Sequence, residues 1–265
     1  GTFDRPCTTI DAAVSLCVAS RGDIIVCKPG HAESIANATT FQLDKIGIAV
    51  VGLGTGNLRP TFTFTNTAGS VELDSANCLL QNLRFRADVS AVVVGISVDA
   101  AGCSILECEF DYIDTGDDFV LHIDCEDVAG TTIERCRFIA EIAAGSNAAI
   151  RMDNADRIRI RGNYSYGTYA KAPLWSDTTG DTGDGSTVST EVEIAYNNFY
   201  NTDTAAGIAI DLNNADKGLI AYNVLGGSAG GVAVTLDPGS CFCVQNYGIS
   251  EIDKTGALVP ATADT

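Results

Sequence analysis

Apolar and polar residues follow a repeating pattern along most of the chain. In most units an aliphatic residue is followed three positions later by a small or amide residue, and five positions later by an aromatic or apolar residue; Ser165 departs from the pattern at the last position. The leading residues of successive units are Leu80, Ile105, Ile133, Ile160, Ile194, Ile220 and, in the last unit, Cys243. They lie 25, 28, 27, 34, 26 and 23 residues apart, so the chain contains an internal repeat with a period near 27.

A second motif shares this period. In each unit a short stretch of alternating apolar and polar residues ends in aspartate, and alternation of this kind predicts half-buried strands. The aspartates are Asp74, Asp99, Asp124, Asp153, Asp177, Asp211 and Asp237. The longest interval in both motifs is 34 residues and spans the same part of the chain, which indicates one insertion in an otherwise regular repeat.

Two or three short strands per repeat, with no helical pattern between them, cannot enclose a core alone. Stacking each unit on the previous one buries a continuous interior and places equivalent residues in columns about 4.8 Å apart. The sequence therefore predicts an all-β fold, a single-stranded parallel β-helix, over residues 1–250. Residues 8–20 have a threonine N-cap and apolar residues at helical spacing, which predicts a short N-terminal capping helix. Residues 251–265 break the repeat and are expected to form a C-terminal tail or cap.

Three columns have predicted structural roles. Asn163, Asn197, Asn223 and Asn246 are expected to hydrogen-bond between successive turns. The ten cysteines replace core aliphatic residues or turn amides, so we expect them to be reduced, with Cys108 and Cys136 as the pair to consider for any disulfide. The aspartates are expected to accept backbone N–H groups in turns; a ladder of Ca²⁺ ions between them is the alternative.

Charge excludes several classes of function. The chain has 16 Lys and Arg against 34 Asp and Glu, a formal net charge of −18. Binding to nucleic acid or to anionic lipid depends on basic residues, so neither is expected. No apolar run approaches the roughly 18 residues of a membrane helix, so we expect no membrane insertion. Residues 1–5 lack a basic region followed by an apolar one, so no signal peptide is expected.

The N-terminal run resembles a known superfamily. Residues 10–35, through Gly22-Asp23-Ile24-Ile25-Val26 and Pro29-Gly30-His31, look like the first coil of the right-handed, pectate-lyase-like β-helix superfamily, and the asparagine column looks like its turn ladder. The combination is most similar to β-helix proteins encoded by tailed phages. The resemblance implies a right-handed helix, a homotrimer in contact with other virion proteins, and a place on the phage particle surface. The superfamily contains lyases, hydrolases, esterases and non-catalytic virion parts, so the resemblance does not settle activity.

One group of residues is a candidate for catalysis: Asp117, Asp118, His122 and Arg151. We expect His122 and Arg151 to occupy the same outward position on successive coils, where two carboxylates, an imidazole and a guanidinium would suit glycosidic bond cleavage. Gly116-Asp117-Asp118 resembles an aspartate motif of polygalacturonases. However, the Asn-Thr-Asp element at residues 201–203 follows it instead of preceding it, and the His-Gly and Arg-x-Lys elements are missing. A lyase route would instead use Arg151 beside Asp124 and Asp153.

The insertion and its surroundings supply two binding candidates. Asp177, Asp181 and Asp184 lie in a loop rich in Gly, Asp and Thr and are candidate Ca²⁺ ligands, although their spacing is not that of an EF-hand. Trp175, Tyr164, Tyr166 and Tyr169 are candidates for stacking on sugar rings.

Three hypotheses follow. The first is a non-enzymatic virion component, such as a capsid decoration, fibre or tail part, which contacts host or environmental glycans. The second is a polysaccharide lyase or glycoside hydrolase, and the third is a carbohydrate-binding module. Apart from a possible Ca²⁺ ion, no cofactor is expected.

Overall fold

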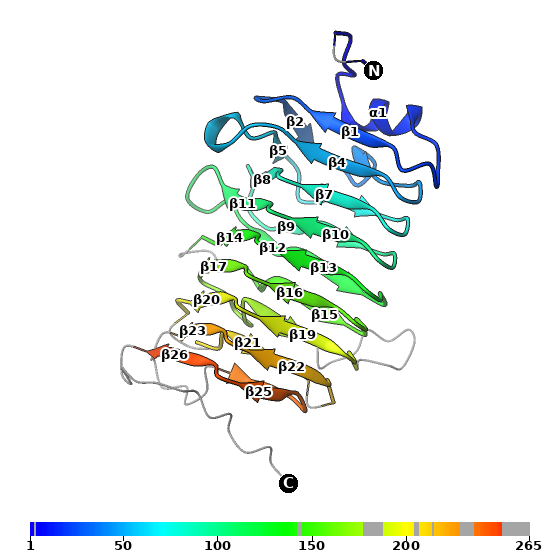
Figure 1. Ribbon diagram of the computed structural model, residues 1–265. Coiled ribbons are helices and arrows are strands. Elements are labelled where there is room, and N and C mark those ends of the chain that lie inside the picture. Colours follow the sequence, from blue (N-terminus) through cyan, green and yellow to red (C-terminus); the bar gives the residue numbers. More distant parts are fainter. Residues whose placement is uncertain are drawn as a thin grey trace.

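The chain forms a right-handed parallel β-helix (Figure 1). In this computed structural model the described residues are 1–2, 4–141, 145–176, 188–203, 207–213, 215–227 and 236–250. Every strand pairs in parallel with its equivalents in the preceding and following coils, which produces three sheets that run along one axis. We name these sheets A, B and C in the order in which each coil visits them. The all-β fold predicted from the repeat is confirmed.

Sheets A and B each contain nine strands. Sheet A consists of β1 (Ile24–Cys27), β4 (Ala49–Gly52), β7 (Leu79–Gln81), β10 (Ser104–Leu106), β13 (Thr132–Glu134), β16 (Arg159–Arg161), β19 (Val192–Ala195), β22 (Gly218–Ala221) and β25 (Phe242–Val244). Sheet B consists of β2 (Ala32–Ile35), β5 (Thr61–Phe64), β8 (Arg84–Ala87), β11 (Glu109–Tyr112), β14 (Arg137–Ile139), β17 (Tyr164–Gly167), β20 (Asn198–Asn201), β23 (Val224–Gly227) and β26 (Tyr247–Ser250).

Sheet C contains eight strands. They are β3 (Phe41–Gln42), β6 (Val71–Leu73), β9 (Val92–Val98), β12 (Phe119–Glu126), β15 (Ala148–Asp153), β18 (Leu174–Ser176), β21 (Ile210–Asp211) and β24 (Leu236–Asp237). A 3₁₀ turn, Gly56–Leu58, precedes β5.

The N-terminal end is covered by a short helix, as predicted. Helix α1 (Ile10–Leu16) begins at Thr9, whose hydroxyl accepts the N–H of Ala12 at 3.2 Å. Ile10 and Val14 are buried against the first coil, so the helix shields the open end of the apolar interior. No helix in the described part of the chain combines the length and apolarity needed to cross a bilayer.

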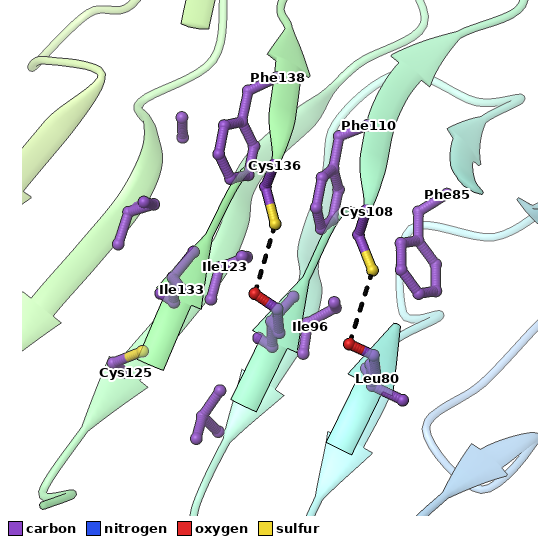
Figure 2. Packing of buried hydrophobic residues seen from close by; sticks show 14 of the residues in the cluster. Leu80, Phe85, Ile96, Cys108, Phe110, Ile123, Cys125, Ile133, Cys136 and Phe138 are labelled. Atoms are coloured by element: carbon purple, nitrogen blue, oxygen red, sulfur yellow. Dashed lines mark hydrogen bonds between the residues drawn. The ribbon is translucent and has the colours of Figure 1, made fainter. Parts of the chain in front are cut away.

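The interior is built from columns of like side chains. The leading aliphatic residues of the repeat are register partners, as in Leu80, Ile105 and Ile133. Phe110 stacks between Phe85 and Phe138, with ring centroids 5.2 and 5.0 Å apart (Figure 2). Each ring therefore packs on the next, and the repeat becomes a continuous hydrophobic core.

Six of the ten cysteines belong to this core, in agreement with the prediction that cysteine replaces core residues. All ten are free thiols, and six of them are buried. Cys108 and Cys136 lie on successive coils, and the Sγ of Cys136 donates to the carbonyl oxygen of Ile105 at 3.4 Å (Figure 2). The two thiols are not joined by a disulfide in this structure.

A sharp corner separates sheet A from sheet B in the seven coils from β7 onward. One residue per corner adopts a left-handed conformation with φ between 47° and 64°: Asn82, Glu107, Arg135, Gly162, Tyr196, Tyr222 and Gln245. Only one of the seven is glycine, so the other six adopt a conformation that costs about 1 kcal/mol for a residue with a Cβ atom. The asparagine ladder follows directly after the last four of these corners and supplies hydrogen bonds there.

Candidate functional site

Acidic side chains line the outer face of sheet C. One column consists of Gln42, Glu72, Ser97, Asp124, Arg151, Trp175, Asp211 and Asp237. Glu126 and Asp153 are register partners in a second column two residues further along the strands, and Asp74 and Asp99 follow the paired residues Leu73 and Val98 in the same position.

The expected single file of seven aspartates is therefore wrong in register. Asp124 is the partner of Arg151, and Asp211 is the partner of Trp175, so the aspartates divide between two neighbouring columns. A shift of two residues leaves every side chain on the same face of its strand, so alternation alone cannot detect it. The six described aspartates nevertheless lie in two adjacent columns on sheet C.

Arg151 is the centre of an ion-pair cluster on this face. Its Nε and Nη2 donate to the two carboxylate oxygens of Asp124 at 2.6 and 2.9 Å, and Nη2 also donates to Glu126 at 2.6 Å. Partial burial acts to lower the pKa of Arg151, but the hydrogen bonds that Arg151 donates to Asp124 and the charges of Asp124, Glu126 and Asp153 outweigh it and raise that pKa. Arg151 therefore remains a cation and cannot serve as a base.

His122 does not accompany Arg151, and the expectation that it faces outward is wrong. The side chain is fully buried, and its ring lies within 6.2 Å of the rings of Phe110, Phe119, Phe138 and Tyr169. Nδ1 lies 3.2 Å from the carbonyl oxygen of Ala148, and burial lowers the pKa of His122 to about 4. The ring is therefore neutral at pH 7 and has no access to a polymer outside the helix.

A break in the alternation explains the position of His122. In β12 both His122 and Ile123 are buried, and in β9 both Gly95 and Ile96 are buried. A Cβ atom at Gly95 would lie 2.6 Å from the carbonyl oxygen of His122. The absence of a Cβ atom at Gly95 thus allows β9 and β12 to lie close together at the point where the alternation of inward and outward side chains breaks in both strands.

Asp117 and Asp118 act within the loop before β12. Asp118 is buried and accepts the N–H of Ala91 at 2.7 Å, and burial raises the pKa of its carboxyl. Asp117 accepts the N–H of Asp114 at 3.0 Å. Both carboxylates thus accept hydrogen bonds from backbone N–H groups. Arg151 instead pairs with Asp124 and Glu126 on the outer face of sheet C.

The four aromatic candidates do not form one platform. Trp175 is half-buried on sheet C, with Nζ of Lys171 5.4 Å from its ring. Tyr169 is buried and its hydroxyl accepts a hydrogen bond from Ser165 at 2.7 Å, so the expectation that it contacts a ligand is wrong in this structure. Its strand-end position gave no sign of this burial.

Tyr164 and Tyr166 do lie together, on the outer face of sheet B. They are joined there by Tyr200, which pairs in register with Tyr166 and whose ring lies 6.1 Å from that of Tyr164. Tyr166 is the most exposed of the three. The sequence analysis missed Tyr200, although its spacing of 34 residues from Tyr166 matches the longest interval of the repeat and could have identified it.

Three carboxylates near the N-terminal end of sheet C come close together. Single oxygens of Glu72, Asp74 and Asp99 all lie within 4.8 Å of one another, a geometry that could hold a cation. Burial and, to a smaller extent, the charges of Asp99 and Asp74 raise the pKa of Glu72, and a hydrogen bond with Ser70 opposes this shift. The Ca²⁺ candidates Asp177, Asp181 and Asp184 lie outside the described residues.

Further along this face, Asp211 and Asp237 are register partners. Burial and the charge of Asp237 raise the pKa of Asp211 to about 6, and Lys171 opposes this shift. Asp211 therefore changes its protonation near neutral pH, beside the only tryptophan.

Comparisons of the chain with protein-family models, with curated proteins and with solved structures found no match. The candidate sites described above are therefore argued from the residues of this chain alone.

Proposed function

We propose that the protein is a non-enzymatic structural β-helix on the surface of a tailed-phage particle, as a capsid decoration, fibre or tail component. In this proposal it is a homotrimer that contacts other virion proteins. The observation that best supports a structural role is the separation of the catalytic candidates. His122 lies in the core, and Arg151 forms ion pairs with Asp124 and Glu126 on the outer face. The phage setting is supported by the resemblance of residues 10–35 and of the asparagine column.

Turnover assays test the structural role. The full chain is incubated with neutral and acidic polysaccharides, and new reducing ends and the ultraviolet absorbance of unsaturated uronates are followed. We expect no turnover. Activity that disappears in Asp211→Asn or Arg151→Met, but persists in Arg159→Met, would contradict the proposal and favour the lyase or hydrolase alternative, with its site on sheet C.

The phage setting has a separate test. We expect genes for portal and capsid proteins beside the gene for this chain, and antibody against the chain should label intact particles. Neighbouring genes for sugar uptake and catabolism, with no particle labelling, would contradict it.

Carbohydrate binding is a second candidate, favoured by the exposed cluster of Tyr164, Tyr166 and Tyr200. Aromatic rings on a flat sheet can stack on the apolar faces of sugars. Affinity electrophoresis in gels that contain polysaccharide measures this binding. We expect Tyr166→Ala and Tyr200→Ala to abolish retardation, while Tyr247→Ala, which removes a more exposed tyrosine at the end of the same sheet, leaves it unchanged. Loss in Trp175→Ala instead would place the site on sheet C.

A further inference from the structure

Exposed apolar side chains gather at both ends of the outer face of sheet A. Among the described residues sixteen large hydrophobic side chains are exposed, and five of them project from this sheet, against two from sheet B and one from sheet C. At the N-terminal end these are Ile24 and Val26 on β1, with 64% and 52% of their surface exposed. At the C-terminal end they are Leu219 on β22 and Phe242 and Val244 on β25, with exposures of 38%, 81% and 40%.

Register connects these residues into two outward columns. The column that starts at Ile24 ends at Phe242, and the column that starts at Val26 ends at Val244. Half-buried Val51 and Leu79 extend the N-terminal apolar surface across β4 and β7. The surface is thus a flat row of nine strands, which spans about 40 Å at the usual strand spacing.

A charged band crosses the middle of this face. It consists of Glu134 on β13, Arg159 and Arg161 on β16 and Glu193 on β19. Arg161 and Glu193 form an ion pair at 2.7 Å, and the band has two positive and two negative groups. In a chain with a net charge of −18, this face combines a balanced charge with exposed apolar ends.

Along the face, an apolar end is followed by the charged band, which has no net charge, and then by the second apolar end. A second copy placed on it in either direction would bring apolar ends together. Because the charges of the band sum to zero, two such faces meet without the net repulsion that two acidic faces of sheet C would have. An anionic membrane or a nucleic acid would be repelled by the acidic remainder of the chain.

We propose that the outer face of sheet A is the surface through which copies of this chain associate. The inference deepens the proposed structural role, because it identifies the face that an oligomer would use. Desolvation of Ile24, Val26 and Phe242 supplies the driving force, and the band of β13, β16 and β19 adds no net charge that would oppose it.

Sedimentation velocity of the full chain tests the proposal. We expect an oligomer that becomes monomeric in Val26→Asp and in Phe242→Asp, with a dissociation constant at least about tenfold higher in each. Val93→Asp is the matched control, because Val93 is 57% exposed on sheet C and should leave the oligomer intact. Circular dichroism should show the same folded spectrum for all four proteins.

Two results would overturn the proposal. One is a wild-type chain that remains monomeric up to about 100 μM, where even weak specific contacts are populated. The other is equal dissociation by Val93→Asp, which would place the contact elsewhere. Flotation of a monomeric chain with neutral-lipid vesicles, lost in Val26→Asp, would assign the face to a membrane instead. Polysaccharide turnover by an intact oligomer would contradict the proposed function, but it would not contradict the proposed interface.

Discussion

Asn197 holds Asn163 through a single side-chain oxygen. Oδ1 of Asn197 accepts the backbone N–H of Asn163 at 2.9 Å and its side-chain Nδ2 at 3.0 Å. Asn223 makes the same two contacts with Asn197, and Asn246 makes them with Asn223. Each amide Nδ2 also donates to a carbonyl of the preceding coil, as Asn197 does to Ile160 at 2.9 Å. The ladder therefore satisfies buried donors and acceptors at every corner that it occupies.

The first prediction concerns this ladder. Asn197→Ala would leave the backbone N–H of Asn163 and the carbonyl of Ile160 buried without these partners, and each such group costs about 1 to 3 kcal/mol. We expect a loss of about 2 to 4 kcal/mol in the free energy of unfolding, measured by urea titration. The control is Asn198→Ala, since Asn198 is the next residue and is exposed. Equal effects of the two substitutions would contradict a structural ladder.

The second prediction uses the buried imidazole. Burial lowers the pKa of His122 from 6.5 to about 4. At pH values between these two, His122 is therefore protonated in the unfolded chain and neutral in the folded chain. Stability from this group is complete above pH 6.5 and is lost as the pH falls toward 4. The expected loss is about 2 kcal/mol by pH 5.

The experiment is urea unfolding from pH 7.5 to pH 4.5 for the wild type and for His122→Met, which has a similar volume and no titratable group. The difference between the two proteins isolates His122 from the carboxylates, whose own titration is common to both. We expect the substitution to become progressively more favourable as the pH falls. If the difference in the free energy of unfolding between the two proteins did not depend on pH, His122 would be solvated in the folded chain. It would then be a candidate catalytic residue again.

The sequence predicted the core better than the surface, for a physical reason. Inward positions such as Ile133 and Phe138 recur because each must fill the same space in every coil, so the pattern identified their columns correctly. Outward positions face solvent and carry weaker constraints. Asp124 was consequently assigned to the wrong column, since a two-residue shift preserves alternation. The burial of His122 depends on Gly95 in the neighbouring coil, a contact that no local pattern contains.

The third prediction distinguishes the cluster at Arg151 from ordinary surface pairs. Arg151 and Asp124 have 15% and 11% of their side chains exposed, so Arg151→Met would leave Asp124 and Glu126 close together with little solvent to screen them. We expect a loss of about 2 to 3 kcal/mol at pH 7. The loss should shrink at pH 4, where the carboxylates begin to bind protons.

Arg159→Met is the control for this cluster. Arg159 is 64% exposed and its Nε lies 3.6 Å from Glu193, so its removal should cost less than about 0.5 kcal/mol. Urea titration of both variants at the two pH values provides the measurement. If Arg151→Met were no more destabilising than Arg159→Met, the cluster would contribute no more than a solvated pair, and Arg151 would be available to a ligand.

The fourth prediction concerns the free thiols. Burial raises the pKa of Cys125 and Cys136, and both side chains are buried in the core, whereas Cys7 and Cys17 are partly exposed near α1. The pKa of Cys17 is also raised, by burial and by Asp23, so exposure to the reagent is what distinguishes the two groups. An aromatic disulfide reagent at pH 8 should label Cys7 and Cys17 in the folded protein. Cys125 and Cys136 should react only after urea unfolds the chain, as mapped by mass spectrometry of peptides. Labelling of Cys125 at the same rate as Cys17 would mean that the core opens locally, and a Cys108–Cys136 peptide lighter by two hydrogens would show that these thiols do form a disulfide.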